Sequence, residues 1–475
     1  MTAQSRQALL ALLDRWVPAQ RWFGGKGTRG ELTLTGTLTL PGLPGPDSPD
    51  SPDSPDSQHN PDSASVQLHV VSAVTTRGEV TTYQVPLVFR PHEQPDQAAA
   101  LVGVLDGATY VYDGAHDPEF VRRWLRLIDE QGSVSTPGGL SAQGRRQPGG
   151  VPVPVGGRAK VLSGEQSNTS VIVEGTPPVI IKLFRTLYGG ANPDVVVQSA
   201  LAAAGSTRVP APSGWIEGSW TRADGSAVSG HLAFASEFLV GTRDAWREAS
   251  ESLAQGVHFG PQAYTLGQAT AEVHRTLAQE LATEAASPAR RSELVHALRV
   301  RAAWACEQVA DLTGLEDALR DIHHQLDELV DFPVLQRIHG DYHLGQVLDV
   351  PGRGWVLLDF EGEPLRPISE RSDPDLALRD VAGMLRSFDY AAHQAEAGRL
   401  APTEAHAWGQ EWAGRCREEF CLGYADVAGH DPREYAALLV ALELDKALYE
   451  VVYEARNRPD WIDVPLRAVA RLTGS

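Results

Sequence analysis

Apolar residues alternate with polar ones in the first part of the chain and recur at helical spacing in the later part. Leucine and threonine alternate over residues 31–40, and similar patterns over 65–73 and 80–90 predict strands of a small antiparallel sheet. In the later part, the apolar spacing predicts a run of helices. These helices are expected over residues 264–281, 294–309, 315–329, 377–395, 404–423 and 432–452. The pattern therefore predicts an α+β protein.

Further elements are expected near the strands. One helix covers Leu9 to Trp16, and another runs from Asp117 to Glu130, with Asp117 as its N-cap. Residues 41–64 contain Pro-Asp-Ser repeats and almost no apolar side chains, so we expect a disordered loop there. The Gly-, Gln- and Pro-rich stretch 131–154 is expected to be a connection at a lobe boundary.

Composition and charge narrow the classes of function. The chain has 475 residues, 42% of them hydrophobic, enough for about two or three packed units. Its 41 basic and 61 acidic residues give a net charge of −20 without a basic block, so we expect no nucleic acid and no membrane as partner. The three cysteines suit a reducing compartment, and residues 1–20 lack the uncharged core of a signal peptide. We expect a cytoplasmic monomer.

The strongest chemical signal is the stretch from His339 to Pro364. Asp341 is followed five residues later by Gln346, and Asp359 ends an apolar strand eighteen residues after Asp341. Phosphoryl transfer needs a carboxylate that accepts the proton of the substrate hydroxyl, and oxygen ligands for magnesium on the nucleotide. We therefore predict Asp341 as the catalytic base and Gln346 and Asp359 as Mg²⁺ ligands. A structural role, as turn caps and a strand-end carboxylate, is the alternative.

A loop of small polar residues lies earlier in the chain, between strands expected over 159–162 and 169–173. Such a loop can offer backbone N–H groups to a triphosphate, as the glycine-rich loop of kinases does. An ordinary hairpin is an equally good interpretation of the loop alone. Nucleotide contacts are predicted from Ser163, Gly164, Gln166, Ser167 and Asn168.

The next strand, Val179 to Phe184, carries a lysine inside an apolar run. Because a buried lysine is costly without an anionic partner, Lys182 is predicted to bind the phosphates of the nucleotide, like the strand lysine of protein kinases. A protein kinase would place a glutamate on the following helix to pair with this lysine. The helix expected over 192–204 offers only Asp194 and Gln198, so the partner of Lys182 is left open.

Two more strands, expected over 213–218 and 231–238, lead to residues 237–241. This segment is predicted to cross between two lobes, where exposed backbone groups can hydrogen-bond an adenine edge. Glu237 and Leu239 are therefore predicted to bind the nucleotide.

The last long helix carries a polar and aromatic face. Lys446, Tyr449, Tyr453 and Arg456 are spaced by three, four and three residues, so they lie on one side of the helix. Such groups suit a sugar, but a solvated helix face has the same spacing. Substrate contacts are predicted from His343, Glu361, Asp389, Lys446, Tyr449 and Tyr453. For His343, ordering of its own loop is an equal alternative.

Several longer motifs occur in order along nearly the whole chain. They are Arg21–Gly27, Gly164–Ser170, Ile181–Arg185, His339–Asp341, Asp359–Pro364, Arg379–Tyr390 and Asp445–Trp461. Together they resemble the actinobacterial maltokinases, a family within the aminoglycoside phosphotransferase-like, protein-kinase-like superfamily. The chain departs from the pattern at Val196, where an acidic residue would be expected to pair with the strand lysine.

The resemblance implies an activity and a domain organisation. The activity is transfer of the γ-phosphate of ATP, with Mg²⁺, to the anomeric hydroxyl of maltose, giving maltose 1-phosphate for glycogen and other α-glucan synthesis. The fold is bilobal and protein-kinase-like with an N-terminal cap. We expect the cap over residues 1–115, a kinase N-lobe-like nucleotide-binding subdomain over 116–240, and a helical C-lobe with the sugar site over 241–475.

Other functions stay open. Similar actinobacterial proteins resemble glucosamine kinases, and carboxylates such as Glu361, Glu363, Asp389 and Glu450 could suit a cationic sugar. A non-catalytic nucleotide-binding regulator is favoured by the missing helix glutamate, although the base and both magnesium ligands are present. An aminoglycoside phosphotransferase is a further alternative.

Overall fold

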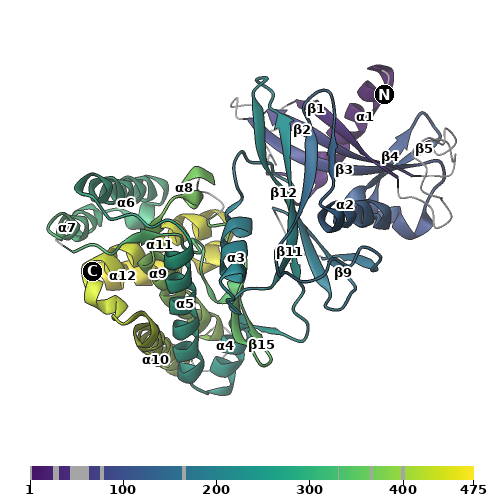
Figure 1. Ribbon diagram of the computed structural model, residues 1–475. Helices are drawn as coiled ribbons and strands as arrows, with labels where there is room; N and C mark the ends of the chain where they lie inside the picture. Colours follow the sequence, from purple (N-terminus) through teal and green to yellow (C-terminus); the bar gives the residue numbers. More distant parts are fainter. Residues whose placement is uncertain are drawn as a thin grey trace. The chain divides into compact units, whose positions relative to one another are not determined.

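The computed structural model forms two compact units (Figure 1). It describes residues 3–24, 31–42, 64–74, 80–162, 167–329, 331–363, 366, 368–396 and 402–474. The first unit contains Met1–Val195 and Ala211–Leu239, and the second contains Val196–Pro210 and Val240–Ser475. The loop predicted to be disordered lies outside the described residues from 43 to 63. The finer division of the first unit at residue 115 stays a prediction.

The first unit begins with helix α1 (Ala3–Trp16) and a five-stranded antiparallel sheet, which we call the cap sheet. Its strand order is β1-β2-β3-β5-β4. The strands are β1 (Leu32–Leu40), β2 (Ser65–Val74), β3 (Val80–Arg90), β4 (Leu101–Leu105) and β5 (Thr109–Asp113). The strands predicted from alternation are confirmed. The last two were missed because five residues are too few for a clear alternating pattern.

A seven-stranded antiparallel sheet completes the first unit, with strand order β6-β7-β11-β12-β10-β9-β8. The strands are β6 (Ser133–Ser135), β7 (Ser141–Arg146), β8 (Ala159–Val161), β9 (Thr169–Val173), β10 (Val179–Leu183), β11 (Pro212–Thr221) and β12 (Ala227–Glu237). Helix α2 (Pro118–Glu130) buries its apolar face against this sheet. Its predicted N-cap is confirmed, because the Asp117 carboxylate accepts a hydrogen bond from the Glu119 N–H at 2.8 Å.

The prediction of a lobe boundary at residues 131–154 was wrong. Strands β6 and β7 lie in this stretch and belong to the seven-stranded sheet. They are polar strands, so apolar alternation could not reveal them. Gly144 in β7 also lies directly against α2, where a Cβ atom would come within 1.8 Å of the Leu127 carbonyl oxygen. The glycine in this stretch is therefore required by close packing and does not mark a linker.

The second unit is mostly helical. Its helices are α4 (Ala245–Gln255), α5 (Gly260–Glu280), α6 (Pro288–Gln308), α7 (Glu316–Asp327), α8 (Ile368–Ser372), α9 (Leu378–Glu396), α10 (Pro402–Ala428), α11 (Ala436–Asn457) and α12 (Asp463–Thr473). The helices predicted from apolar spacing are confirmed, whereas α4, α8 and α12 were not predicted. Helix α3 (Pro193–Ala203) begins in the first unit and ends in the second.

Two short sheets in the second unit hold the segment that carries the predicted base. One contains β13 (Arg243–Asp244), β15 (Val347–Val350) and β16 (Gly354–Leu357). The other pairs β14 (Leu335–Gln336) with β17 (Asp375–Leu376). Residues 337–346 connect β14 to β15, so both ends of this segment are fixed by strand pairing.

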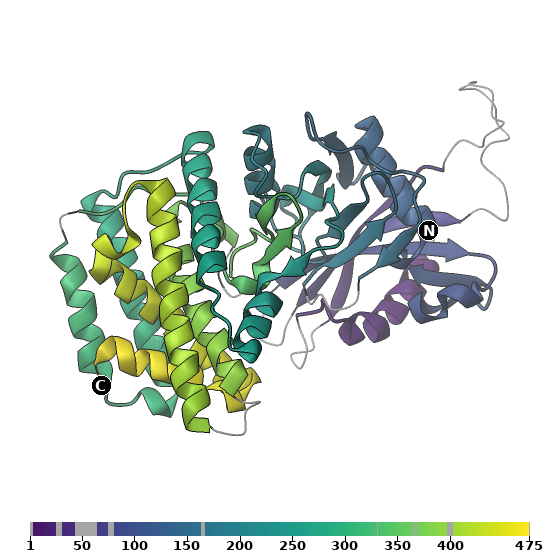
Figure 2. The ribbon, with the colours of Figure 1, turned by 90° about the horizontal axis from the view of Figure 1, so that it is seen from below.

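Helices α5 and α10 lie side by side in the second unit (Figures 1 and 2). Glycines allow their backbones to approach closely. A Cβ atom at Gly423 of α10 would lie 1.9 Å from the Tyr264 carbonyl oxygen of α5, and one at Gly267 of α5 would lie 2.1 Å from the Phe420 carbonyl oxygen. The packing of these helices therefore depends on glycine at the contact.

We predict that Gly423→Ala lowers the free energy of unfolding by about 3 kcal/mol, because the helices must separate to admit the methyl group. Gly414→Ala is the matched control in the same helix: it has nothing within 4 Å, and alanine there should raise stability by about 0.5–1 kcal/mol. Urea unfolding followed by circular dichroism measures both changes. Equal stability of the two variants would contradict this account of the contact.

Candidate active site

The predicted base meets a lysine of helix α11. The Lys446 ammonium nitrogen lies 3.1 Å from Oδ1 of Asp341 and 2.7 Å from Oε1 of Glu363. The structure thus brings together the residue predicted as base and a residue predicted to contact substrate, although they are 105 positions apart in the sequence. It also adds Glu363 as the second carboxylate on the same ammonium group.

All three groups of this cluster are held in their charged forms. Burial alone would raise the pKa of Asp341, but the Lys446 ammonium and the nearby histidines outweigh it, and the pKa is lowered. The pKa of Glu363 is lowered in the same way, against burial, by Lys446 and Arg366. Burial would lower the pKa of Lys446, but the two carboxylates raise it well above its ordinary value.

The backbone of the loop around Asp341 is fixed by Asp380, at the start of helix α9. Its carboxylate accepts hydrogen bonds from the backbone N–H of His339 at 2.7 Å and of Gly340 at 2.9 Å. The His274 ring nitrogen Nε2 lies 2.9 Å from the same side chain. Asp380 is fully buried, so this arrangement orders the residues directly before Asp341. Sequence reasoning gave Asp380 no role, because only the fold brings it to the loop.

A pocket beside Asp341 is lined by charged side chains that are already paired. Asp445 binds the guanidinium groups of Arg301 at 2.7 Å and Arg379 at 2.8 Å. The second oxygen of Glu363 binds Arg366 at 2.8 Å. The carboxylates lining this pocket therefore have cationic or N–H partners within the described residues.

The aromatic residues of the predicted sugar face lie at this pocket and just beyond it. Tyr449 lines the pocket, and its ring centre is 5.1 Å from the Lys446 nitrogen. The Tyr453 ring stacks on Tyr449 with centroids 6.4 Å apart and is 41% exposed. Arg456 points elsewhere: it donates to Oε1 of Gln308 at 2.7 Å.

The predicted magnesium ligands contact each other. Nε2 of Gln346 donates to Oδ2 of Asp359 at 3.2 Å. A carboxylate oxygen of Glu361 lies within 4.8 Å of one on Asp359, so a residue predicted to contact substrate is beside the predicted metal ligands. Asp359 has a φ of 61°, in the left-handed region that non-glycine residues rarely adopt. Strain of this kind clusters at functional sites.

Two histidines order the same loop. Nε2 of His339 lies 2.7 Å from the Leu358 carbonyl oxygen, which joins the loop to the residue before Asp359. Nδ1 of His343 accepts a hydrogen bond from the Gly345 N–H at 3.0 Å. His343 therefore orders its own turn, and its predicted contact with substrate stays a prediction.

In the first unit the structure gives Lys182 a partner. Its ammonium nitrogen lies 3.3 Å from Oδ2 of Asp194, which occupies the first turn of helix α3. Asp194 is the second residue of that helix, and it is almost fully buried. An aspartate at the start of the helix therefore takes the place of the glutamate that a protein kinase carries later in the helix. The sequence left Asp194 and Gln198 open as partners, because the choice between them depends on how α3 packs against β10.

The structure describes some of the other residues that are predicted to bind nucleotide. Ser163, Gly164 and Gln166 lie outside the described residues, whereas Ser167 and Asn168 lead directly into β9. The backbone N–H of Glu237 donates to the Ala211 carbonyl at 2.8 Å, and Leu239 is buried. A contact of Glu237 or Leu239 with adenine stays a prediction.

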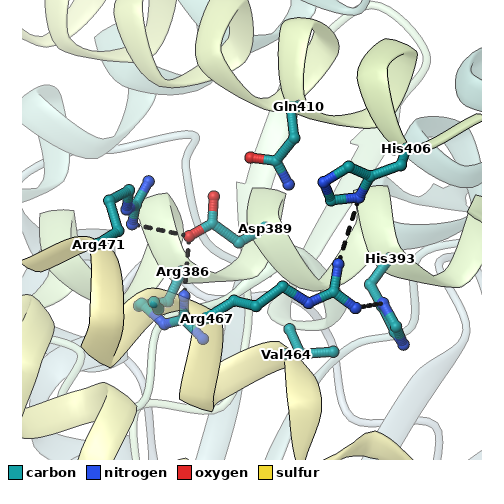
Figure 3. Close-up of a pocket in the computed structure, with 9 residues that line it drawn as sticks. Arg386, Asp389, His393, His406, Gln410, Val464, Arg467 and Arg471 are labelled. Carbon is teal, nitrogen blue, oxygen red and sulfur yellow. Dashed lines mark hydrogen bonds and ion pairs between the residues drawn. The ribbon is translucent and has the colours of Figure 1, made fainter. Parts of the chain in front are cut away.

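Asp389 is not among the residues that line the Asp341 pocket. It lines a second pocket of about 300 Å³, formed by helices α9, α10 and α12 (Figure 3). Its carboxylate lies between the guanidinium groups of Arg386 at 2.8 Å and Arg471 at 3.0 Å. Asp389 lies nine residues beyond Asp380 in helix α9, and its predicted contact with substrate stays a prediction.

Comparison with known proteins agrees with this architecture. Residues 158–420 match the phosphotransferase enzyme family, and residues 55–117 match the maltokinase N-terminal cap domain. The chain belongs to the phosphotransferase enzyme family. The predicted protein-kinase-like fold with an N-terminal cap is confirmed.

This member of the phosphotransferase family is similar in sequence to glucosamine kinases. It is 29% identical to the enzyme from Streptacidiphilus jiangxiensis over 343 residues, covering 66% of this chain and 72% of that protein. The match to the enzyme from Mycolicibacterium smegmatis is also 29% identical, over 322 residues, covering 65% of this chain and 78% of that protein. Among solved structures, a glucosamine kinase crystal form matches with a TM-score of 0.67 and 22% identity, covering 98% of this chain and 99% of that chain. A glucosamine kinase with glucosamine, ADP and inorganic phosphate matches with a TM-score of 0.64 and 22% identity, over 98% of each chain.

None of the helices that the structure describes combines the length and apolar character needed to cross a membrane.

The Lys446 contact predicts a change in the pH dependence of phosphotransferase activity. The lowered pKa keeps Asp341 ionised as the pH falls to about 5, so wild type should show no acid limb above that pH. In Lys446→Met the largest pKa-lowering charge is gone and burial raises the pKa of Asp341, so kcat/KM should fall as the pH drops from 7 to about 5. Stability should also fall by about 3 kcal/mol, because two buried carboxylates lose their shared cation.

Lys446→Arg is the control, since it keeps the charge. Initial rates across the pH range, with thermal melting at each pH, separate titration of Asp341 from unfolding. A flat profile in Lys446→Met would show that Lys446 does not set the charge of the site.

Proposed function

We propose that the protein is an ATP- and Mg²⁺-dependent sugar kinase, and that maltose is its acceptor, giving maltose 1-phosphate for α-glucan synthesis. The observation that carries the proposal is the cluster of Asp341, Lys446 and Glu363 beside the ring of Tyr449. It combines an ionised carboxylate with an aromatic surface of the kind that sugars pack against. The maltokinase cap domain matched at residues 55–117 supports the same acceptor.

In this proposal Asp341 accepts the proton of the attacking sugar hydroxyl. Its lowered pKa makes it a weak base, which suits a transition state in which the phosphoryl group is nearly free and the proton leaves late. Lys446 holds the Asp341 carboxylate in place and limits its rotation. Asp380 fixes the preceding backbone, so the carboxylate is positioned before the sugar arrives.

Gln346 and Asp359 would hold the magnesium ion. An amide and a carboxylate oxygen form the hard-oxygen donor set that Mg²⁺ prefers, and their side chains already touch at 3.2 Å. When bound, the ion neutralises charge on the phosphates. Lys182, fixed by Asp194, supplies the cation for the phosphates in the first unit.

The paired state of the pocket favours a neutral sugar. Glu363 is shared by Lys446 and Arg366, and Asp445 by Arg301 and Arg379. An ammonium group on the sugar would have to compete with these cations for each carboxylate. Hydroxyl groups can instead accept from the guanidinium and ammonium donors.

Glucosamine is the second candidate acceptor. It is favoured by the 29% identity to glucosamine kinases. Its amino group would need a carboxylate to bind it. Glu361, whose carboxylate lies within 4.8 Å of that of Asp359, is the residue to test for that role.

A sugar panel with ATP and Mg²⁺ tests the proposal. We predict phosphorylation of maltose at the anomeric hydroxyl, assigned by ³¹P NMR, with kcat/KM at least about tenfold above that for glucosamine, a difference of about 1.4 kcal/mol. Asp341→Asn should lower kcat by about 10²–10⁴, because it removes the base and keeps the shape. Asp224→Asn, on an exposed turn, is the control and should match wild type.

Each outcome points to one interpretation. Preference for glucosamine would replace the acceptor and keep the chemistry. Preference for aminoglycosides would indicate an antibiotic phosphotransferase. ATP binding without transfer to any sugar, or full activity in Asp341→Asn, would overturn the proposed function.

A further inference from the structure

Arg185 is a fully buried arginine in the first unit, two residues beyond the end of strand β10. Nη2 of its guanidinium group donates to both oxygens of the Asp113 carboxylate, at 3.0 Å and 2.8 Å. Asp113 is the last residue of cap-sheet strand β5. A buried, charge-assisted contact of this kind is stronger than a neutral hydrogen bond and holds the two side chains together.

The same guanidinium reaches two further partners. Its Nε donates to the hydroxyl of Thr169 at 2.8 Å. Its carbon lies 5.0 Å from the ring centre of Trp22, which belongs to the Arg21–Gly27 motif that the proposed function leaves without a role. Nη1 has no hydrogen-bond partner among the described residues, so the Trp22 ring face is the group that covers the cation.

The backbone beside Arg185 is also tied to the cap sheet. The Gln84 N–H of strand β3 donates to the Arg185 carbonyl at 2.9 Å, and the Leu187 N–H donates to the Thr82 carbonyl at 2.8 Å. The Gln84 side chain donates to the Phe184 carbonyl at 2.7 Å. Cap-sheet strand β3 therefore fixes the chain on both sides of Arg185.

These contacts converge on the part of the seven-stranded sheet that is proposed to bind ATP. Thr169 begins β9 and directly follows Asn168, a residue predicted to contact the nucleotide. Leu183 pairs with Thr169, and Lys182 pairs with Ser170, in the register of β10 and β9. Any shift of Thr169 relative to β10 would therefore move Asn168 relative to Lys182.

We propose that Arg185 is a positioning residue for ATP. Asp113 and Trp22 of the cap hold its guanidinium group, and through the Thr169 hydroxyl it fixes the start of β9 beside the Lys182 strand. The inference rests on the proposed nucleotide site and deepens it: it gives the cap a role in the affinity for ATP and not in the choice of sugar. A buried ion pair contributes little to stability compared with apolar packing, so specific positioning accounts for its presence better than stabilisation does.

Thr169→Val tests the inference with the smallest change, because it removes the hydroxyl and keeps the shape. We predict that KM for ATP rises about tenfold, the effect of one lost hydrogen bond to a charged group, while KM for the sugar stays within about twofold. Thr37→Val is the matched control: it removes a hydroxyl that contacts Nδ1 of His69 at 3.0 Å, in the cap sheet, whereas Lys182 lies in the other sheet of the unit. It should leave both KM values unchanged.

A double variant, Asp113→Leu with Arg185→Met, guards against misfolding because it removes both charges together and leaves neither one buried alone. Its KM for ATP should rise as in Thr169→Val, with a cooperative thermal transition retained. Binding of a fluorescent ATP analogue is measured in parallel for each variant. If wild type binds the analogue but phosphorylates no sugar, the proposed function fails, and the binding constants of the variants still decide the inference. Unchanged ATP affinity in Thr169→Val, or an equal rise in both KM values, would overturn it.

Discussion

The candidate site depends on the ion pairs that the ammonium group of Lys446 forms. This group is shared between Asp341 and Glu363, two carboxylates that would otherwise repel each other at the base of one pocket. Its charge keeps the pKa of both below the ordinary value despite burial. Helix α11 supplies this lysine and the adjacent Tyr449, so the placement of one helix sets both the charge and the aromatic wall of the pocket.

Around this contact, hydrogen bonds within the second unit hold the loop of Asp341 in place without substrate. Asp380 holds the backbone before Asp341, and His339 ties the same loop to the residue before Asp359. Because the base and the predicted metal ligands share these hydrogen bonds, their separation is fixed by the fold. In the first unit, Lys182 and Arg185 are likewise held in place by ion pairs with Asp194 and Asp113.

Much of this could be predicted from sequence where a local pattern exists. Alternation revealed β1, β2 and β3, and apolar spacing revealed the long helices, but polar strands such as β6 and β7 have no such signal. The order Asp341, Gln346, Asp359 suggested the chemistry because these residues share one short stretch. Whether they carry it is a matter for experiment.

Contacts between distant positions could not be predicted. The pairing of Lys446 with Asp341 spans 105 positions, and Asp380 acts 40 positions from Gly340. Spacing along α11 placed Lys446 and Tyr449 on one face but could not show that Arg456 turns toward Gln308. Nor could spacing show that Asp389 lines a second pocket with Arg471, because that position depends on the packing of α9 against α12.

The most direct test of the account is a crystal structure with maltose, Mg²⁺ and a non-hydrolysable ATP analogue. The account predicts the anomeric hydroxyl within about 3.2 Å of an Asp341 carboxylate oxygen, with a glucose ring against Tyr449. Maltose bound elsewhere, with Asp341 still in contact only with Lys446, would contradict it.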